Sequence, residues 1–156
     1  MIRIWRLCRA AHAQAPLSGE GARIYGGRWN AKGTRMVYCA GSLSLACMEV
    51  LVHLDLRRLP RDYQAIAIDL PDDVPRKILA TPELPPDWNQ VPGPESLKQL
   101  GSAWAATGSE AVLVVPSAVI PFEFNYLVNP GHVDAGRLTV LPAIPFPSDD
   151  RLARPT

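Results

Sequence analysis

The sequence lacks several features that would assign it to a large class of proteins. No stretch approaches the roughly 18 apolar residues of a membrane-spanning helix, and 16 Lys and Arg against 15 Asp and Glu leave a net charge of only +1. A chain with so balanced a charge has no field that would draw it to nucleic acid or to an anionic membrane. We therefore expect neither as a direct partner.

Cysteine is scarce, and its placement excludes disulfide and zinc frameworks. Cys8, Cys39 and Cys47 form no C-x-x-C pair, and the last two lie among apolar residues, where a free thiol packs as a small hydrophobic group. Three arginines interrupt the apolar residues at the start of the chain, so we expect no signal peptide. Reduced thiols without such a signal indicate the cytoplasm.

Familiar catalytic motifs are also missing. The glycines at 19 and 21 lack the third glycine of a dinucleotide fingerprint, and segment 27–34 has Lys before Gly rather than after it, unlike a P-loop. The residue types of a hydrolase triad are available in Ser117, His132 and Glu49. We do not expect a triad, since no G-x-S-x-G motif surrounds any serine. The three histidines share no ligand spacing with the cysteines, so we expect no metal site.

What the sequence does contain is an alternation of strand and helix patterns. The length of 156 residues is typical of one domain, which we expect to span residues 1–156. Apolar and β-branched runs predict strands at 2–7, 36–40, 65–70, 111–115 and 137–144. Helices are expected from the N-cap Ser42 through Leu54, and from Pro94 to just before Gly108.

Three segments are predicted to be irregular. Proline and glycine are dense between residues 15 and 33, which indicates a loop that approaches a ligand closely. Seven prolines between Pro71 and Pro94 discourage regular structure, and we expect a surface excursion, either a lid or a simple loop. Residues 125–132 are predicted to be turn-like.

Arg28 and Tyr38 are candidates for ligand contact. Arg28 follows Gly26 and Gly27, which would let phosphates approach the backbone while the guanidinium offers a bidentate fork; a surface Arg in a turn is the plainer alternative. Tyr38 lies in an expected strand, where a core aromatic is the default. At a cleft it would instead stack on a planar ring, with its hydroxyl at the wet end.

Glu49 is the least ordinary residue of the chain. It lies within an apolar segment of the helix expected from Ser42, and a carboxylate there is rarely buried without a partner. Its partner is either a ligand or a structural arginine. Ser117 follows Pro116 at a strand end, where a turn residue is usual but ligand contacts also gather.

With these residues in view, the chain resembles the RES-domain family, toxins of bacterial toxin–antitoxin pairs named for an Arg, a Glu and a Ser. The matching segments, in order along nearly the whole chain, are 26–33, 37–40, 48–53, 115–118 and 125–132. The resemblance implies an α+β fold similar to the ADP-ribosyltransferase toxins, with a mixed central sheet flanked by helices and a cleft that binds NAD⁺. Arg28, Tyr38, Glu49 and Ser117 are then the expected site.

The family's partners and chemistry are implied as well. Members usually act beside a helix-turn-helix antitoxin that covers the active site, and this chain shows no such segment of its own. NAD⁺ is the implied substrate, with no further cofactor. Its nicotinamide leaves as a neutral base, so one carboxylate at the ribose is sufficient, whereas an ordinary glycoside usually needs two.

The expected roles follow from that chemistry. Arg28 grips the diphosphate or an incoming anion, Tyr38 stacks on the nicotinamide, Glu49 holds the ribose, and Ser117 orients a ribose or phosphate oxygen. Arg6 would join the site if the first strand turns it inward, because a buried guanidinium needs an anion. Together they predict cleavage of the nicotinamide–ribose bond.

The acceptor stays open at this point. Water would make the protein a glycohydrolase, phosphate a phosphorylase, and a protein side chain a mono-ADP-ribosyltransferase. We favour free NAD⁺ as the target of phosphate or water. A non-catalytic binding module, in which Arg28 and Glu49 form an internal ion pair, is the alternative from another class, and a homodimer is also left open.

Overall fold

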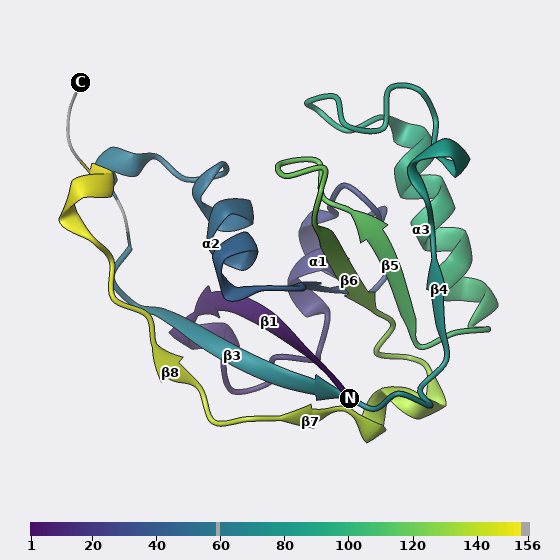
Figure 1. Ribbon diagram of the computed structural model, residues 1–156, viewed down its shortest axis with the longest axis horizontal. Coiled ribbons are helices and arrows are strands. Elements are labelled where there is room, and N and C mark those ends of the chain that lie inside the picture. The colour runs from purple at the N-terminus through teal and green to yellow at the C-terminus, as the bar shows by residue number, and fades with distance from the viewer. Residues whose placement is uncertain (59, 154–156) are drawn as a thin grey trace.

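The computed structural model describes residues 1–58 and 60–153, which form a curled sheet with helices packed on it (Figure 1). The helices are α1 (Glu20–Tyr25), α2 (Leu43–Leu51) and α3 (Glu95–Thr107). The strands are β1 (Ile2–Arg9), β2 (Val37–Ala40), β3 (Tyr63–Leu70), β4 (Arg76–Ile78), β5 (Val112–Pro116), β6 (Phe124–Val128), β7 (Thr139–Val140) and β8 (Ile144–Pro145). Short 3-10 turns occupy Ala10–His12, Leu56–Arg58, Thr81–Glu83, Val133–Arg137 and Asp150–Ala153.

The strands form one mixed sheet in the order β4-β5-β6-β2-β1-β3-β7, with β8 also paired to β3. β4 and β5 run parallel, and the other neighbours run antiparallel. A mixed sheet flanked by helices is the α+β class expected from the sequence, and this prediction is confirmed. Among the described residues, no helix has both the length and the apolar character that a membrane crossing requires.

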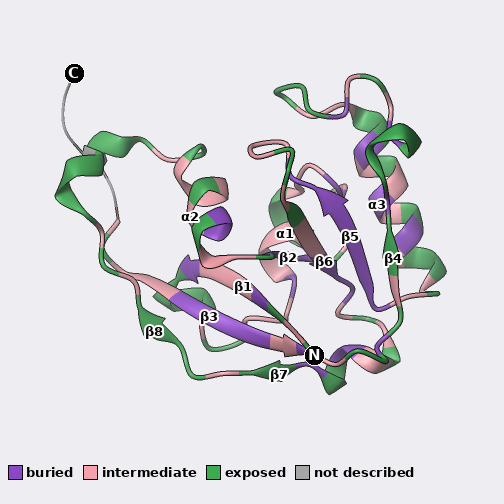
Figure 2. Ribbon diagram, viewed as in Figure 1, coloured by how far each residue is buried: buried purple, intermediate pink, exposed green. Residues whose placement is uncertain are grey.

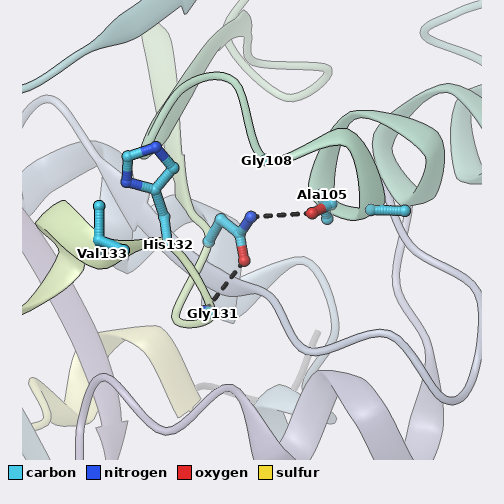
Figure 3. Close-up of a pocket in the computed structure, with 7 residues that line it drawn as sticks. Ala105, Gly108, Gly131, His132 and Val133 are labelled. Atoms are coloured by element: carbon cyan, nitrogen blue, oxygen red, sulfur yellow. Dashed lines mark hydrogen bonds between the residues drawn. The ribbon is translucent and has the colours of Figure 1, made fainter.

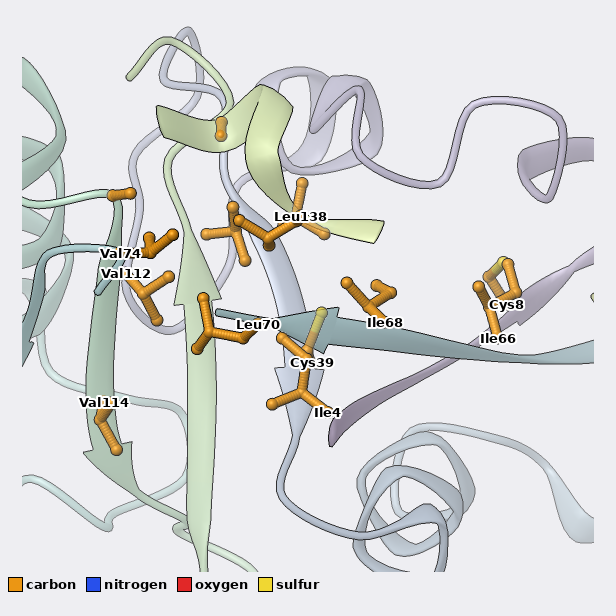
Figure 4. Close-up of a cluster of buried hydrophobic side chains, with 14 residues drawn as sticks. Ile4, Cys8, Cys39, Ile66, Ile68, Leu70, Val74, Val112, Val114 and Leu138 are labelled. Carbon is orange, nitrogen blue, oxygen red and sulfur yellow. The ribbon is translucent and has the colours of Figure 1, made fainter. Parts of the chain in front are cut away.

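Cross-strand register divides the side chains between two faces of the sheet. Trp5, Ala40 and Asn125 lie opposite one another along β1, β2 and β6, so their side chains share one face, here called the Tyr38 face. The other face, here called the Ile4 face, carries the apolar cluster drawn in Figure 4. That cluster joins both halves of the sheet, since it includes Ile68 of β3 and Val112 of β5.

The Tyr38 face carries two further apolar clusters. One packs α2 on the sheet through Leu45, Ala46 and Ala40. The other is larger and lies under α3, where Trp104 packs with the residues around Leu113 of β5. Figure 2 shows the result: β5 is buried along its length, whereas the outer turns of the helices are exposed.

Both predicted helices form for the expected reasons. The Ser42 hydroxyl caps α2 by accepting the Leu45 N–H at 3.1 Å, and the helix ends at Leu51, three residues earlier than predicted. α3 ends at Gly108, whose φ of 66° lies in the left-handed region that favours glycine. The local signals therefore located both helices.

Two segments predicted to be irregular are regular. Helix α1 lies inside the glycine-dense stretch, and β6 occupies the start of the segment 125–132 that was expected to be turn-like. β6 is hydrogen-bonded on both edges, to β2 and to β5. This pairing outweighs the low strand preference of asparagine, and the turn begins only after Val128.

The proline-dense connector is also more ordered than a surface excursion. It contains β4 and then turns inward, so that Leu84 and Trp88 are 8% and 7% exposed within the cluster under α3. The last strand expected at 137–144 is split into β7 and β8, which pair with different parts of β3. Burial of Leu84 and Trp88 thus fixes the connector against α3 despite its many prolines.

Candidate active site

The candidate site lies on the Tyr38 face, at the seam between the two apolar clusters. Asn125 marks this seam, because its cross-strand neighbours are Ala40 from the cluster under α2 and Val115 from the cluster under α3. Tyr38 is a diagonal neighbour of Asn125 on the same face, and diagonal neighbours in an antiparallel pair are about 7–8 Å apart, within reach of an aromatic side chain. Residues of β2, β6, α2 and the end of β5 meet here.

Glu49 reaches this seam from α2. It lies four and three residues after Leu45 and Ala46, so it shares the buried face of the helix. Its Oε1 atom accepts two hydrogen bonds, from the Ser117 hydroxyl at 2.7 Å and from the Asn125 amide at 2.6 Å. Among the described residues, the partners of this carboxylate are therefore two neutral donors and not a structural arginine.

Ser117 is fully buried directly after β5. Its hydroxyl donates to Glu49 and accepts the backbone N–H groups of Val119 and Ile120 at 3.1 and 3.0 Å. One donor and two acceptor positions are all that a hydroxyl has. The hydroxyl of Ser117 is thus fully used inside the protein, and its one donated hydrogen bond goes to Glu49.

Tyr38 holds the loop that carries Arg28. Its hydroxyl donates to Asn30 Oδ1 at 2.6 Å and accepts the Trp29 N–H at 3.0 Å. Gly27 leaves room for this arrangement, because a Cβ there would lie 2.5 Å from the Tyr38 oxygen. Burial raises the pKa of Tyr38. The sequence analysis expected the hydroxyl to face solvent if Tyr38 bordered a cleft. The hydroxyl instead points into the protein, toward Asn30 and Trp29.

Arg28 lies beside Tyr38 and faces the connector. One guanidinium nitrogen, Nη1, donates to the carbonyls of Trp88 and Gln90 at 3.1 and 2.8 Å. Gly93 lets the side chain pass, since a Cβ there would lie 2.8 Å from Nη1. Among the described residues, no acceptor meets Nε or Nη2 of Arg28, which leaves three N–H groups for a ligand.

The Arg28 loop is fixed from beneath. Asn30 is fully buried, and its amide donates to the carbonyls of Ala22, Ala31 and Thr34 at 2.8 to 3.1 Å, which ties the loop to α1. The Ser102 hydroxyl of α3 accepts the Ala31 N–H at 2.9 Å. These hydrogen bonds anchor the end of the glycine-dense segment that carries Arg28, here called the Arg28 platform.

Arg6 lies on the opposite face of the sheet. As expected, it shares the face of Ile4, but that face is not the one that carries Glu49. Its Nη1 donates to the Tyr38 carbonyl at 3.2 Å, while its buried Nε meets no acceptor among the described residues. Contact of Arg6 with a dinucleotide stays a prediction.

The structure thus brings four of the five predicted residues to one face in two groups, Glu49 with Ser117 and Tyr38 with Arg28. Sequence reasoning missed Asn125 as a hydrogen-bond partner of Glu49, because segment 125–132 was interpreted as a turn. A signal existed: an asparagine alternates with the buried Leu127 in a run of aromatic and aliphatic residues. A polar residue on the apolar face of a strand indicates that its side chain has a hydrogen-bond partner there.

Two hollows lie elsewhere, beside α3. They have volumes of about 230 and 330 Å³ and share Ala105, Ala106, Asn129 and Gly131. Figure 3 shows the smaller one. They share no lining residue with the Glu49 group, so they are separate from the seam. Among residues 1–58 and 60–153, no group of His, Cys, Asp and Glu side chains is placed to hold a metal ion.

Comparison with known proteins gives a consistent family. A family model described as the RES domain matches residues 3–149. The chain is similar to a protein named "Prs ADP-ribosylating toxin" from Sphingobium sp. (strain YBL2), with 42% identity over 84% of each chain. It is also similar to "Toxin Res" from Photorhabdus laumondii subsp. laumondii, with 37% identity over 97% of each chain.

The fold has a solved counterpart. The chain resembles a chain in the crystal structure of the M. tuberculosis MbcT–MbcA toxin–antitoxin complex, with a TM-score of 0.76. The match covers 94% of this chain and 84% of that one. Because the identity is 24%, this likeness supports the fold alone.

Proposed function

From the premise that this chain belongs to the RES-domain family, we propose that it is the toxin of a toxin–antitoxin pair and that it cleaves the nicotinamide–ribose bond of NAD⁺. The family membership rests on the match to residues 3–149 and on relatives that align over most of their length. Two of these relatives carry toxin names. The chemistry is proposed from the residues at the seam.

The observation that carries the proposal is the placement of Glu49. One oxygen of its carboxylate, Oε1, accepts hydrogen bonds from Ser117 and Asn125 on the face of the sheet that also carries Tyr38. No cation neutralises it among the described salt bridges. A fixed, unneutralised carboxylate is suited to stabilise positive charge that develops nearby.

Cleavage of NAD⁺ develops such a charge. The bond between the ribose C1′ and the nicotinamide nitrogen breaks, and its electron pair leaves with the neutral nicotinamide. Positive charge then grows on the ribose ring, where Glu49 Oε2 would face it. The new bond to C1′ is formed either by the oxygen of water, which then loses a proton to solvent, or by an anionic oxygen of phosphate, which has no proton to lose. No general acid is needed for this leaving group, in contrast to ordinary glycosides.

Arg28 and Tyr38 complete the proposed site. The three N–H groups of Arg28 that are not bonded to the connector would bind the diphosphate or an incoming phosphate. Tyr38 would present its ring to the nicotinamide while its hydroxyl holds the loop. Neither a metal nor a cofactor beyond NAD⁺ as substrate enters the proposal.

A second candidate function is transfer of ADP-ribose to a protein side chain. The name of the Sphingobium relative, an ADP-ribosylating toxin, favours it. The same carboxylate serves both reactions, because the step at the ribose is shared and only the acceptor differs. We keep water or phosphate as the first candidate.

An antitoxin is the proposed partner. Phe122 and Val91 are 92% and 87% exposed. Phe122 belongs to the turn after Ser117, and Val91 follows Gln90, whose carbonyl binds Arg28. A protein that covers both residues would bury apolar surface at the rim of the site. We propose that this partner is an antitoxin of the helix-turn-helix type, and substitution of both residues by serine is expected to weaken its binding.

The proposal is tested by following the fate of NAD⁺ with the purified protein. Nicotinamide release that needs phosphate indicates phosphorolysis, and release without it indicates hydrolysis. Adenine-labelled NAD⁺ that marks a protein in a cell extract indicates transfer. If neither release nor labelling occurs, the chain is a binding module.

A further inference from the structure

The side chain of Asn125 serves one partner. Among the described residues, its only hydrogen bond goes from Nδ2 to Glu49 Oε1, at 2.6 Å, while its Oδ1 atom is buried and meets no donor. A buried acceptor without a partner is costly, and native folds seldom leave one. The amide is thus placed so that Nδ2 binds Glu49, although this placement leaves the buried Oδ1 without a donor.

The chemistry of the contact fixes the orientation of the amide. Oε1 of an ionised carboxylate can only accept, so the group at 2.6 Å from it must be the NH₂ of Asn125. A flipped amide would bring two oxygens together at that distance. The Ser117 hydroxyl donates to the same Oε1 at 2.7 Å. Two donors, from the end of β5 and the start of β6, therefore converge on one oxygen.

We propose that Asn125 is a positioning residue of the NAD⁺-cleaving site, which sets Glu49 so that Oε2 alone faces the ribose. This inference rests on the proposed function. With Ser117 alone, the carboxylate could pivot about a single hydrogen bond, and either oxygen would meet the substrate. With both donors in place, its plane is fixed before substrate binds, which is the preorganisation that favours charge stabilisation in the transition state.

Two substitutions test this role. Asn125→Leu keeps the branched shape of the side chain and removes the donor, so kcat is expected to fall about 10- to 100-fold while KM stays within about threefold. Asn125→Asp replaces the donor by a second carboxylate, which repels Glu49 unless the two share a proton. When the introduced carboxyl group is protonated, it donates as the amide does. The activity of this variant, relative to wild type, is therefore expected to rise as the pH is lowered.

Asn129 offers a matched control. It is also a buried asparagine just past β6, but both halves of its amide are used within the fold, by the Ala105 carbonyl at 2.9 Å and the Gly131 N–H at 3.0 Å. Asn129→Asp is expected to lower the melting temperature. It should leave kcat per folded molecule and the shape of the pH profile as in wild type.

The outcomes separate this role from the proposed function. The inference is overturned if folded Asn125→Leu turns over NAD⁺ as wild type does, or if the Asn125→Asp profile parallels that of wild type. If wild type itself releases no nicotinamide, the proposed function fails first. A crystal structure of Asn125→Leu then still decides whether Asn125 positions Glu49: a displaced Glu49 carboxylate supports this part of the inference, and an unmoved one refutes it.

Discussion

The hydroxyl of Tyr38 is the most informative single group to remove. In Tyr38→Phe the ring stays and only the oxygen is lost, together with its bonds to Asn30 Oδ1 and to the Trp29 N–H. Asn30 is fully buried and Trp29 is 2% exposed, so water cannot take the place of the hydroxyl. Two polar groups are left without partners in the platform that carries Arg28.

The magnitude follows from those two groups. Each buried polar group that loses its partner costs about 1–3 kcal/mol, so with two such groups the free energy of unfolding is expected to fall by about 2–6 kcal/mol. For a chain of this size, each kcal/mol lowers the melting temperature by about 2–4 °C. Tyr38→Phe should therefore melt about 4–24 °C below wild type.

Thermal and urea unfolding, followed by circular dichroism, measure this loss. Tyr25→Phe is the control, because Tyr25 is 78% exposed and its substitution should change the stability by less than about 0.5 kcal/mol. If Tyr38→Phe melts within about 2 °C of wild type, its hydroxyl faces solvent. The account of the Arg28 platform would then be wrong.

Three further predictions concern packing and ionisation. Gly101→Ala should cost about 3 kcal/mol or more, because its Cβ would overlap the Trp29 carbonyl; normal urea unfolding of this variant would show that α3 does not press on the loop. Burial raises the pKa of Cys39 to about 12, so a thiol reagent at pH 8 should modify the partly exposed Cys47 in the native protein and Cys39 only after unfolding. The raised pKa of Tyr38 stabilises the fold below the usual tyrosine value of about 10 and loses this effect as the pH rises above it. The drop in stability between pH 8 and 11 should therefore be smaller in Tyr38→Phe, and equal drops would contradict the burial of the hydroxyl.

Much of the fold could be predicted because local chemistry decides it. Ser42 and Gly108 mark helix ends through a cap and a left-handed turn, and apolar runs mark the strands. β6 was missed because its pairing with two neighbours is a property of the whole sheet. The inward turn of the connector was missed for the same reason, since the burial of Trp88 depends on α3.

The candidate site likewise has a part that could be predicted from the sequence and a part that could not. The predictable part was the set of residue types, a lone carboxylate in an apolar helix above all. The directions of the side chains were not predictable, because they depend on sheet register. Register places Arg6 on the opposite face from Tyr38, and it brings Asn125 and Ser117 from two strands to one oxygen of Glu49.

The most direct test of the central claim compares nicotinamide release by wild type and by Glu49→Gln. The substitution keeps the size of the side chain and removes the charge that would stabilise the ribose in the transition state. We expect release by wild type and a loss of at least about 100-fold in kcat for Glu49→Gln, with only a modest change in NAD⁺ binding. Release at the wild-type rate by Glu49→Gln would contradict the central claim.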